Sequence, residues 1–360
     1  MQSRNRGAAL EASESVLADV CGCCLPRRRF LTQAGAIGAL GAFGAVGSVA
    51  QTTQPHRIDI HHHILPPAYM QAIAARRGGP VPDWSAARSL EEMDKTGIAT
   101  SMLSIVQPGV WLGNDEEGRR LARECNDFGA RMVRDHPRRF GLFAALPLGD
   151  VPGSLSELTY ALDTLKADGI GLMTSFGNKW LGDPAFWPVL EELNRRKAVI
   201  YTHPTQPDCC RNLVTDVMPS TVEWTTDTTR TIASLVFTGT AAKFPDIRWI
   251  FSHGGGTAPF LIGRFHTQEA MMKDRDRRFP QGVLHEIRKF YYDTAQANHP
   301  GALAALLAMV PSSQVLLGTD YPFRKPAEEI GGVGAYKFSA SDLRAIEREN
   351  ALRLVPRLAA

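Results

Sequence analysis

The chain has 360 residues, of which 44% are hydrophobic, and it carries a formal net charge of +3 and six cysteines. This length allows one large or two medium domains, and the hydrophobic fraction is ordinary for a globular protein with a sizeable core. The small charge gives no indication of a nucleic-acid partner, and the cysteine spacing is not that of a disulfide-bonded scaffold.

The first fifty residues have the pattern of an export signal. Arg27-Arg28-Arg29-Phe30-Leu31 precedes a stretch of small and apolar residues, 32–50, that contains no charge. Because Arg-Arg-x-Phe-Leu resembles a twin-arginine motif, residues 1–50 are predicted to be a twin-arginine-type signal peptide and 51–360 the mature domain. We expect a periplasmic protein with no stable membrane span after signal removal, or a cytoplasmic one if the signal is not used. A disordered basic N-terminus is the alternative.

The first apolar run of the mature chain ends in three consecutive histidines. Apolar and polar residues alternate there, which indicates a strand. Side chains two apart share a face of a strand, so one face is expected to carry Asp59, His61 and His63 and the other Ile58, Ile60 and His62. Two imidazoles on one face are half of a metal site, with a solvated strand end as the alternative. His62 is expected to be structural.

Short apolar runs alternate with amphipathic stretches along the rest of the chain. The eight runs are Ile58–His63, Thr100–Ile105, Phe140–Leu146, Ile170–Thr174, Ala198–His203, Arg248–His253, Lys289–Asp293 and Gln314–Asp320. The stretches include Glu116–Asp135, Leu155–Lys166, Ala185–Arg196, Thr228–Phe244 and Gly301–Val310, with long loops expected at Pro66–Pro82 and Pro204–Trp224. This alternation predicts a single-domain (β/α)8 TIM barrel. A doubly wound sheet is the alternative, although no Gly-x-Gly-x-x-Gly follows the first run.

Candidate metal ligands fall at the ends of these predicted strands. His61 and His63 end the first run, His203 the fifth, His253 the sixth and Asp320 the eighth. Barrel active sites form at the carboxyl ends of the strands, so these side chains are expected to meet at one rim. A single histidine at a strand end usually faces water, but the joint placement predicts a shared site.

The sequence resembles the metal-dependent amidohydrolase superfamily, and within it the branch of aminocarboxymuconate semialdehyde, 6-methylsalicylate and resorcylate decarboxylases. The likeness runs from about Arg57 to Leu354 and is carried by Asp59-Ile60-His61-His62-His63, Tyr201-Thr202-His203-Pro204, Ser252-His253-Gly254-Gly255-Gly256 and Leu317-Gly318-Thr319-Asp320-Tyr321-Pro322-Phe323. The resemblance implies one divalent metal, usually zinc with manganese as the alternative, held by His61, His63, His203 and Asp320. It also implies that His253 is catalytic and not a permanent ligand.

Two reactions suit three imidazoles and one carboxylate around a divalent ion with an open position. The fourth run, Ile170–Thr174, has no lysine of the kind that superfamily members with two metals carboxylate, which favours one metal. The resemblance favours a nonoxidative decarboxylase (a carboxy-lyase) of a small aromatic or unsaturated carboxylic acid such as a 2-hydroxybenzoate, with His253 and Asp320 handling the proton. The alternatives are a metal-dependent hydrolase of a lactone, ester or amide, and an exported binding protein without turnover.

An acidic substrate is expected to meet an arginine. Arg264 resembles a carboxylate-binding arginine of the aminocarboxymuconate branch, Arg230 is a second candidate, and Trp111 is a candidate wall for an aromatic ring. Phe176 and Trp224 could also serve as walls. Where that decarboxylase has an arginine before its Glu-Met-Asp-like motif this chain has Ser89, which shifts the expected substrate toward an aromatic hydroxy acid. The resemblance also implies a homo-oligomer.

Overall fold

The computed structural model describes residues 56–74, 82–211 and 213–359, so the predicted signal peptide lies outside the described residues. All of these described residues belong to one compact unit. Eight parallel strands pair in the order β1-β2-β3-β4-β7-β8-β9-β10. Their bounds are β1 Arg57–Ile64, β2 Ile98–Ile105, β3 Phe140–Ala145, β4 Gly169–Met173, β7 Val199–His203, β8 Arg248–Phe251, β9 Tyr291–Asp293 and β10 Val315–Leu316. Each predicted strand is present.

The sheet closes on itself through hydrogen bonds between β1 and the segment that follows β10. The Ile60 N–H donates to the Leu317 carbonyl, and the Asp320 N–H donates to the His61 carbonyl, each with an N···O distance of 2.9 Å. The predicted (β/α)8 barrel is therefore confirmed. This closure also places the segment after β10 beside the end of β1, where the histidine cluster lies.

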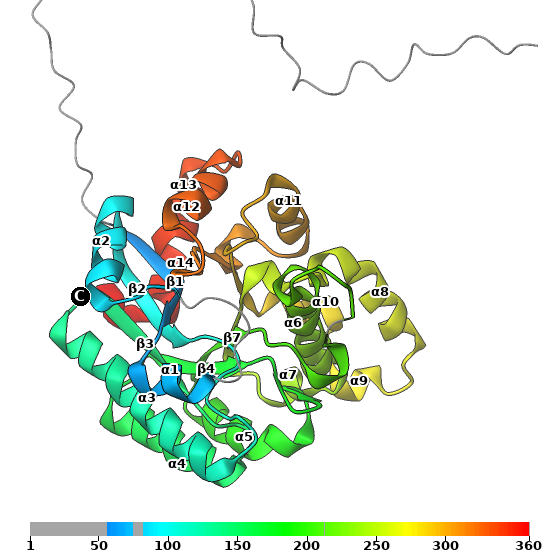
Figure 1. Cartoon of the computed structure of the whole chain (residues 1–360). Helices are drawn as coiled ribbons and strands as arrows, with labels where there is room; N and C mark the ends of the chain where they lie inside the picture. Colours follow the sequence, from blue (N-terminus) through cyan, green and yellow to red (C-terminus); the bar gives the residue numbers. More distant parts are fainter. Residues whose placement is uncertain (1–55, 75–81, 212, 360) are drawn as a thin grey trace, which may run out of the picture. The chain divides into compact units, whose positions relative to one another are not determined.

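Helices connect the strands and lie outside them (Figure 1). They are α1 Pro67–Ile73, α2 Ala86–Thr96, α3 Asp115–Asp135, α4 Val151–Thr159, α5 Trp187–Arg195, α6 Pro219–Phe237, α7 Thr240–Lys243, α8 Ala258–Met271, α9 Arg275–Arg278, α10 Val283–Arg288, α11 Pro300–Met309, α12 Pro326–Ala335, α13 Ala340–Arg344 and α14 Asn350–Leu354. A short antiparallel pair, β5 Ser175–Phe176 and β6 Lys179–Trp180, follows β4. None of the helices in the described ranges combines the length and apolar character that crossing a membrane requires.

The longest helix, α3, shows why the sequence is helical where it is. The Asn114 side chain accepts a hydrogen bond from the Glu117 N–H and so caps the first turn. Acidic residues in the first turn and Arg134 in the last complement the helix dipole. Leu121 and Cys125, four residues apart, are buried on the face toward the strands.

Both long loops expected from the sequence are partly helical. Helix α1 lies within Pro66–Pro82, and α6 begins at Pro219 instead of Thr228. Proline suits the first turn of a helix, where its missing N–H has no partner to lose. The hydroxyls of Thr225 and Thr226 donate to the Val222 carbonyl, so threonines that look like loop residues are accommodated in the helix.

The barrel interior is filled by one apolar cluster. Side chains from six strands meet there, namely Ile58, Ile60, Met102, Phe143, Val199, Tyr201, Ile250 and Leu316. The Phe143 and Tyr201 rings stack with centroids 5.3 Å apart, and the Tyr201 ring lies 5.4 Å from the His61 ring. The apolar interior therefore ends directly beneath the histidines.

A bulge in β1 decides which of its polar residues face inward. Asp59 pairs with Ser101 and His62 pairs with Leu103, so β1 contains one more residue than β2 between these pairs. The bulge places Asp59 beside His62, with 3.2 Å between Asp59 Oδ2 and His62 Nδ1. The prediction that Asp59 shares a face with His61 and His63 is therefore wrong, as is the grouping of Ile58 and Ile60 with His62.

Candidate functional site

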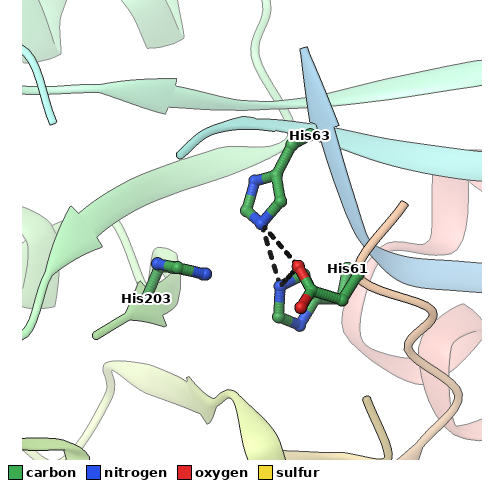
Figure 2. Close-up of side chains that lie close together, drawn as sticks. His61, His63 and His203 are labelled. Atoms are coloured by element: carbon green, nitrogen blue, oxygen red, sulfur yellow. Dashed lines mark hydrogen bonds and ion pairs between the residues drawn. The ribbon is translucent and has the colours of Figure 1, made fainter. Parts of the chain in front are cut away.

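Four buried side chains converge at the carboxyl ends of the strands. His61, His63, His203 and Asp320 each offer one ligand atom, and these atoms lie within 4.8 Å of one another. The Nε2 atoms of His61 and His63 are 3.0 Å apart, and Asp320 Oδ1 is 3.2 Å from each of them (Figure 2). Zinc bonds of about 2.0–2.1 Å would separate tetrahedral ligand atoms by roughly 3.3 Å, so this spacing fits one divalent ion.

The local backbone explains how distant residues meet. The β1 bulge turns both His61 and His63 inward, and His203 is the last residue of β7. Asp320 has a φ of 56°, and its N–H donates to the His61 carbonyl. The left-handed backbone at Asp320 thus brings its carboxylate back over the end of β1.

The other ring nitrogen of each of these histidines has a partner that orients the imidazole. His61 Nδ1 donates to Asp293 Oδ2 over 2.9 Å, and His203 Nδ1 donates to the Pro204 carbonyl over 2.9 Å. These bonds leave Nε2 as the atom with a lone pair. His203 Nε2 is buried and has no hydrogen-bond partner among the described residues, which fits the role of a metal ligand.

His253 lies beside this group. Its Nδ1 donates to the Ala295 carbonyl over 3.0 Å, and its buried Nε2 has no partner among the described residues. The His253 ring centroid is 4.9 Å from that of His61 and 5.7 Å from that of His203. Its free nitrogen is therefore available to a molecule that binds next to the four-residue group.

Asp293, the last residue of β9, holds the site together, and the sequence reasoning did not single it out. One carboxylate oxygen accepts from His61, and the other accepts from the backbone N–H groups of His253 and Ala295 at 2.9 and 3.0 Å. It is fully buried. Its position at the end of the predicted run Lys289–Asp293 was the available signal, because that run ends at the same rim as the histidines.

The charges of the group are strongly coupled. Burial lowers the pKa of His61, but Asp293 and Asp320 raise it more, and the result is about 10. Burial lowers the pKa of His63 to about 4, with opposition from its hydrogen bond to Asp320. Burial raises the pKa of Asp320, yet His61 and His63 outweigh it and hold the carboxyl pKa well below its usual range. The two carboxylates thus stabilise positive charge at this point.

A cavity of about 470 Å³ opens beside His253. Its lining comes from α6, the segment after β8, the start of α8, the loop before α11, α11 itself and the turn after Asp320; the lining residues are Ser220, Thr221, Trp224, Thr225, His253, Gly254, Gly256, Thr257, Pro259, Phe260, Gln296, Ala297, Ala302, Ala305 and Arg324. His253 lines the cavity and also lies beside the four-residue group of His61, His63, His203 and Asp320. The cavity is therefore the place where a substrate can reach the site.

The predicted substrate residues lie elsewhere, with one exception. Arg264 is exposed on α8 and Arg230 is half-buried on α6, and neither lines the cavity. Trp111 donates to Asp115 Oδ1 over 2.9 Å and does not line it either. Trp224, which was also a candidate aromatic wall, does line the cavity, and its ring lies 5.9 Å from the His203 ring.

Ser89 lies in the protein interior and contacts His62 and Trp84. It is buried, its Oγ lies 3.0 Å from His62 Nε2, and it accepts from Trp84 Nε1 over 3.0 Å. His62 also stacks on Tyr321 with ring centroids 4.8 Å apart, so it points away from His61 and His63 as expected. The presence of serine at this position therefore gives no direct information about the substrate.

Comparison with known proteins identifies the relatives of this chain. A family model described as amidohydrolase matches residues 58–357. Decarboxylase macB of Penicillium terrestre is 36% identical over 325 residues, covering 84% of this chain and 95% of the relative. The 6-methylsalicylic acid decarboxylase of Penicillium expansum is 33% identical over 314 residues, covering 84% and 97%. A crystal structure of 2,6-dihydroxybenzoate decarboxylase with 2,6-dihydroxybenzoate has the same fold, with a TM-score of 0.74, 24% identity and coverage of 84% and 100%.

Proposed function

The chain belongs to the amidohydrolase family, and we propose that it is a metal-dependent decarboxylase that removes CO2 from a 2-hydroxybenzoate such as 6-methylsalicylate. The observation that carries this proposal is the free Nε2 of His253, which lies beside the four-residue group and also lines the cavity. The two relatives described above support the reaction class, since both are named as decarboxylases.

Different residues of the chain have different roles in the proposed reaction. A divalent ion held by His61, His63, His203 and Asp320 would supply Lewis-acid stabilisation of negative charge on the substrate oxygens. His253 can deliver a proton only from Nε2, because its Nδ1 is bound to the Ala295 carbonyl.

The proton balance of the reaction follows from these positions. The ring carbon loses CO2 and keeps the bonding electron pair, and it takes up one proton, so that the aromatic acid becomes a phenol. Burial, and after it the charge of His61, lowers the pKa of His253, which makes its protonated form a stronger acid than an ordinary imidazolium. The Trp224 ring can pack against the aromatic substrate at the cavity wall.

The donor set suits zinc best among common metals, because three imidazoles and one carboxylate are typical zinc ligands. We propose one zinc ion per chain, with manganese as the alternative. Elemental analysis of purified protein should give about one divalent ion per chain. Protein that never carries stoichiometric metal would contradict this assignment.

The reaction itself is tested with protein loaded with zinc or manganese. Salicylate and 6-methylsalicylate are supplied as substrates, and both CO2 release and ring absorbance are followed. Release of CO2 with formation of the matching phenol is expected. Aromatic lactones are run in parallel, and opening of a lactone without any CO2 release from the acids would make the protein a hydrolase.

Two further features of the protein are proposals. Export through the predicted signal at residues 1–50 is tested by replacing Arg27-Arg28 with Lys-Lys, which should leave the protein in the cytoplasm. Accumulation of the variant in the periplasm at the normal level would exclude the twin-arginine route. The homo-oligomer implied by the family resemblance is tested by light scattering of the purified protein.

A further inference from the structure

One cationic side chain lines the cavity and lacks an anionic partner. Among the described residues that line it, Arg324 is the only lysine or arginine, and none is an aspartate or glutamate. The next residue, Lys325, forms an ion pair with Glu328 over 3.0 Å. The Arg324 guanidinium instead donates to a neutral amide oxygen, Gln296 Oε1, over 2.6 Å. Guanidinium carries five N–H donors, so most of them are left for a ligand.

The position of Arg324 relative to the proposed metal ligands is fixed by the backbone. The N–H groups of Phe323 and Arg324 both donate to the Asp320 carbonyl, at 2.9 and 3.1 Å. This turn places Arg324 on the same rim as Asp320. The arginine is thus attached to the residue that closes the four-residue group.

Gln296 connects the guanidinium to the site. Its amide nitrogen donates to Asp320 Oδ2 while its amide oxygen accepts from Arg324. Its own backbone is held in a left-handed conformation, with a φ of 53°, by a 2.8 Å bond from its N–H to Glu329 Oε2. Because one amide bonds both groups, at 2.5 Å to Asp320 and 2.6 Å to Arg324, the guanidinium stays within about 8 Å of the Asp320 carboxylate. A single benzoate can therefore reach both ends.

We propose that Arg324 is the substrate-carboxylate site of the cavity, an inference that rests on the proposed decarboxylase function. A planar guanidinium matches a carboxylate with two parallel hydrogen bonds, and the cavity offers it no competing carboxylate. The ligand class is an aromatic monocarboxylate, and neutral esters and lactones lack the group that Arg324 recognises. Arg324 is a specificity-determining residue, and Gln296 is a positioning residue that acts through it.

The kinetic consequence follows from where charge resides during the reaction. Negative charge leaves the carboxylate as CO2 forms, so a bond from Arg324 is stronger in the bound substrate than in the transition state. Removing the guanidinium should therefore raise KM without lowering kcat. A residue that merely supports the fold would lower kcat and metal content as well.

The test compares Arg324→Met with Lys325→Met, a matched loss of one charge on the same turn outside the cavity. Binding of 6-methylsalicylate and of its decarboxylated phenol to zinc-loaded protein is measured by calorimetry. We expect Arg324→Met to weaken binding of the acid by about 10- to 100-fold, the loss of a charge-assisted hydrogen bond, and that of the phenol less than about twofold. Lys325→Met should change neither, and Arg324→Lys should recover part of the affinity for the acid.

Other outcomes overturn the proposal. Equal losses for acid and phenol would mean that Arg324 contacts the hydroxyl or the ring, and a fall in metal content would mean that it only supports Asp320. Unchanged binding of the acid would remove Arg324 from the site altogether. The binding assay needs no turnover, so an acid-specific loss in a protein that releases no CO2 would refute the reaction and leave the carboxylate site standing.

Discussion

Replacing Asp293 by asparagine tests whether the group around His61 is a metal site with a supporting carboxylate. Asp293 is fully buried and accepts three hydrogen bonds, one from His61 Nδ1 and two from the N–H groups of His253 and Ala295. Asparagine has nearly the same volume but only one acceptor oxygen. It therefore cannot satisfy both sides at once.

Each orientation of the asparagine amide has a distinct consequence. If its oxygen faces His61, its NH2 group faces two backbone N–H donors, and the unsatisfied donors destabilise the fold by about 1–3 kcal/mol. If its oxygen faces the backbone, its NH2 group faces His61 Nδ1 and favours the tautomer with the proton on Nε2. That tautomer has no lone pair for a metal, and loss of a supporting carboxylate typically lowers metal affinity by about 10- to 100-fold, or ~1.4–2.7 kcal/mol.

Two measurements on Asp293→Asn distinguish these losses. Zinc affinity is obtained by competition with a chromophoric chelator, and the free energy of unfolding of the metal-free protein by denaturant titration. Asp150→Asn is the control. Asp150 is also buried, and it accepts hydrogen bonds from the Arg119 guanidinium and the Gly153 N–H. It belongs to neither the four-residue group nor its hydrogen-bond partners. The control should lose stability and keep its zinc affinity. An Asp293→Asn protein with zinc affinity within threefold of the wild type and unchanged stability would refute the role given to this carboxylate.

Three other substitutions probe the site and the fold. His253→Gln should lower CO2 release by at least about 100-fold while metal content stays at the wild-type value, since His253 supplies the proton; normal turnover would exclude that role. His62→Ala should cost about 1–3 kcal/mol of unfolding free energy and keep the metal, and a metal-free variant would contradict the bulge in β1. Hydrogen bonds from Arg195 and Arg196 lower the pKa of Glu192 from 4.5 to about 2, so its stabilising effect is full above pH 4.5 and is lost as the pH falls toward 2. Because these groups are partly exposed, Glu192→Gln should be less stable than the control Glu191→Gln by up to about 1 kcal/mol at pH 7, and equally stable near pH 2; a constant difference would refute the assignment.

The barrel could be predicted because its signal is local and repeated. Each of the eight barrel strands coincides with a predicted apolar run, although β10 covers only Val315–Leu316 of the predicted Gln314–Asp320. The residues after Leu316 are not part of a regular strand, and they form hydrogen bonds with β1 instead. One of these bonds runs from the Ile60 N–H to the Leu317 carbonyl. β-strand propensity describes a segment by itself. The end of β10 is instead determined by hydrogen bonding to β1, where the barrel closes.

The bulge in β1 shows a second limit of the same kind. Strict alternation placed Asp59 with His61 and His63, and an extra residue relative to β2 placed it with His62 instead. A bulge is a property of two paired strands, so no pattern within Ile58–Leu65 could reveal it. The two histidines nevertheless share a face as predicted, because they remain two residues apart while the bulge shifts Asp59 relative to both.

The backbone conformation at three residues of the site could not be predicted, for a different reason. His253, Gln296 and Asp320 follow three different strands, and each has a positive φ, of 53°, 53° and 56°. Such a conformation costs a residue other than glycine about 1 kcal/mol or more, and it persists only where the surroundings enforce it. Each of the three N–H groups is held, by Asp293, Glu329 and the His61 carbonyl respectively, at 2.8–2.9 Å. Aspartate and histidine adopt a left-handed backbone more often than most residues, but their presence alone does not predict it. The sequence could therefore reveal the ligands at the strand ends but not the strained turns that direct His253, Gln296 and Arg324 into one cavity.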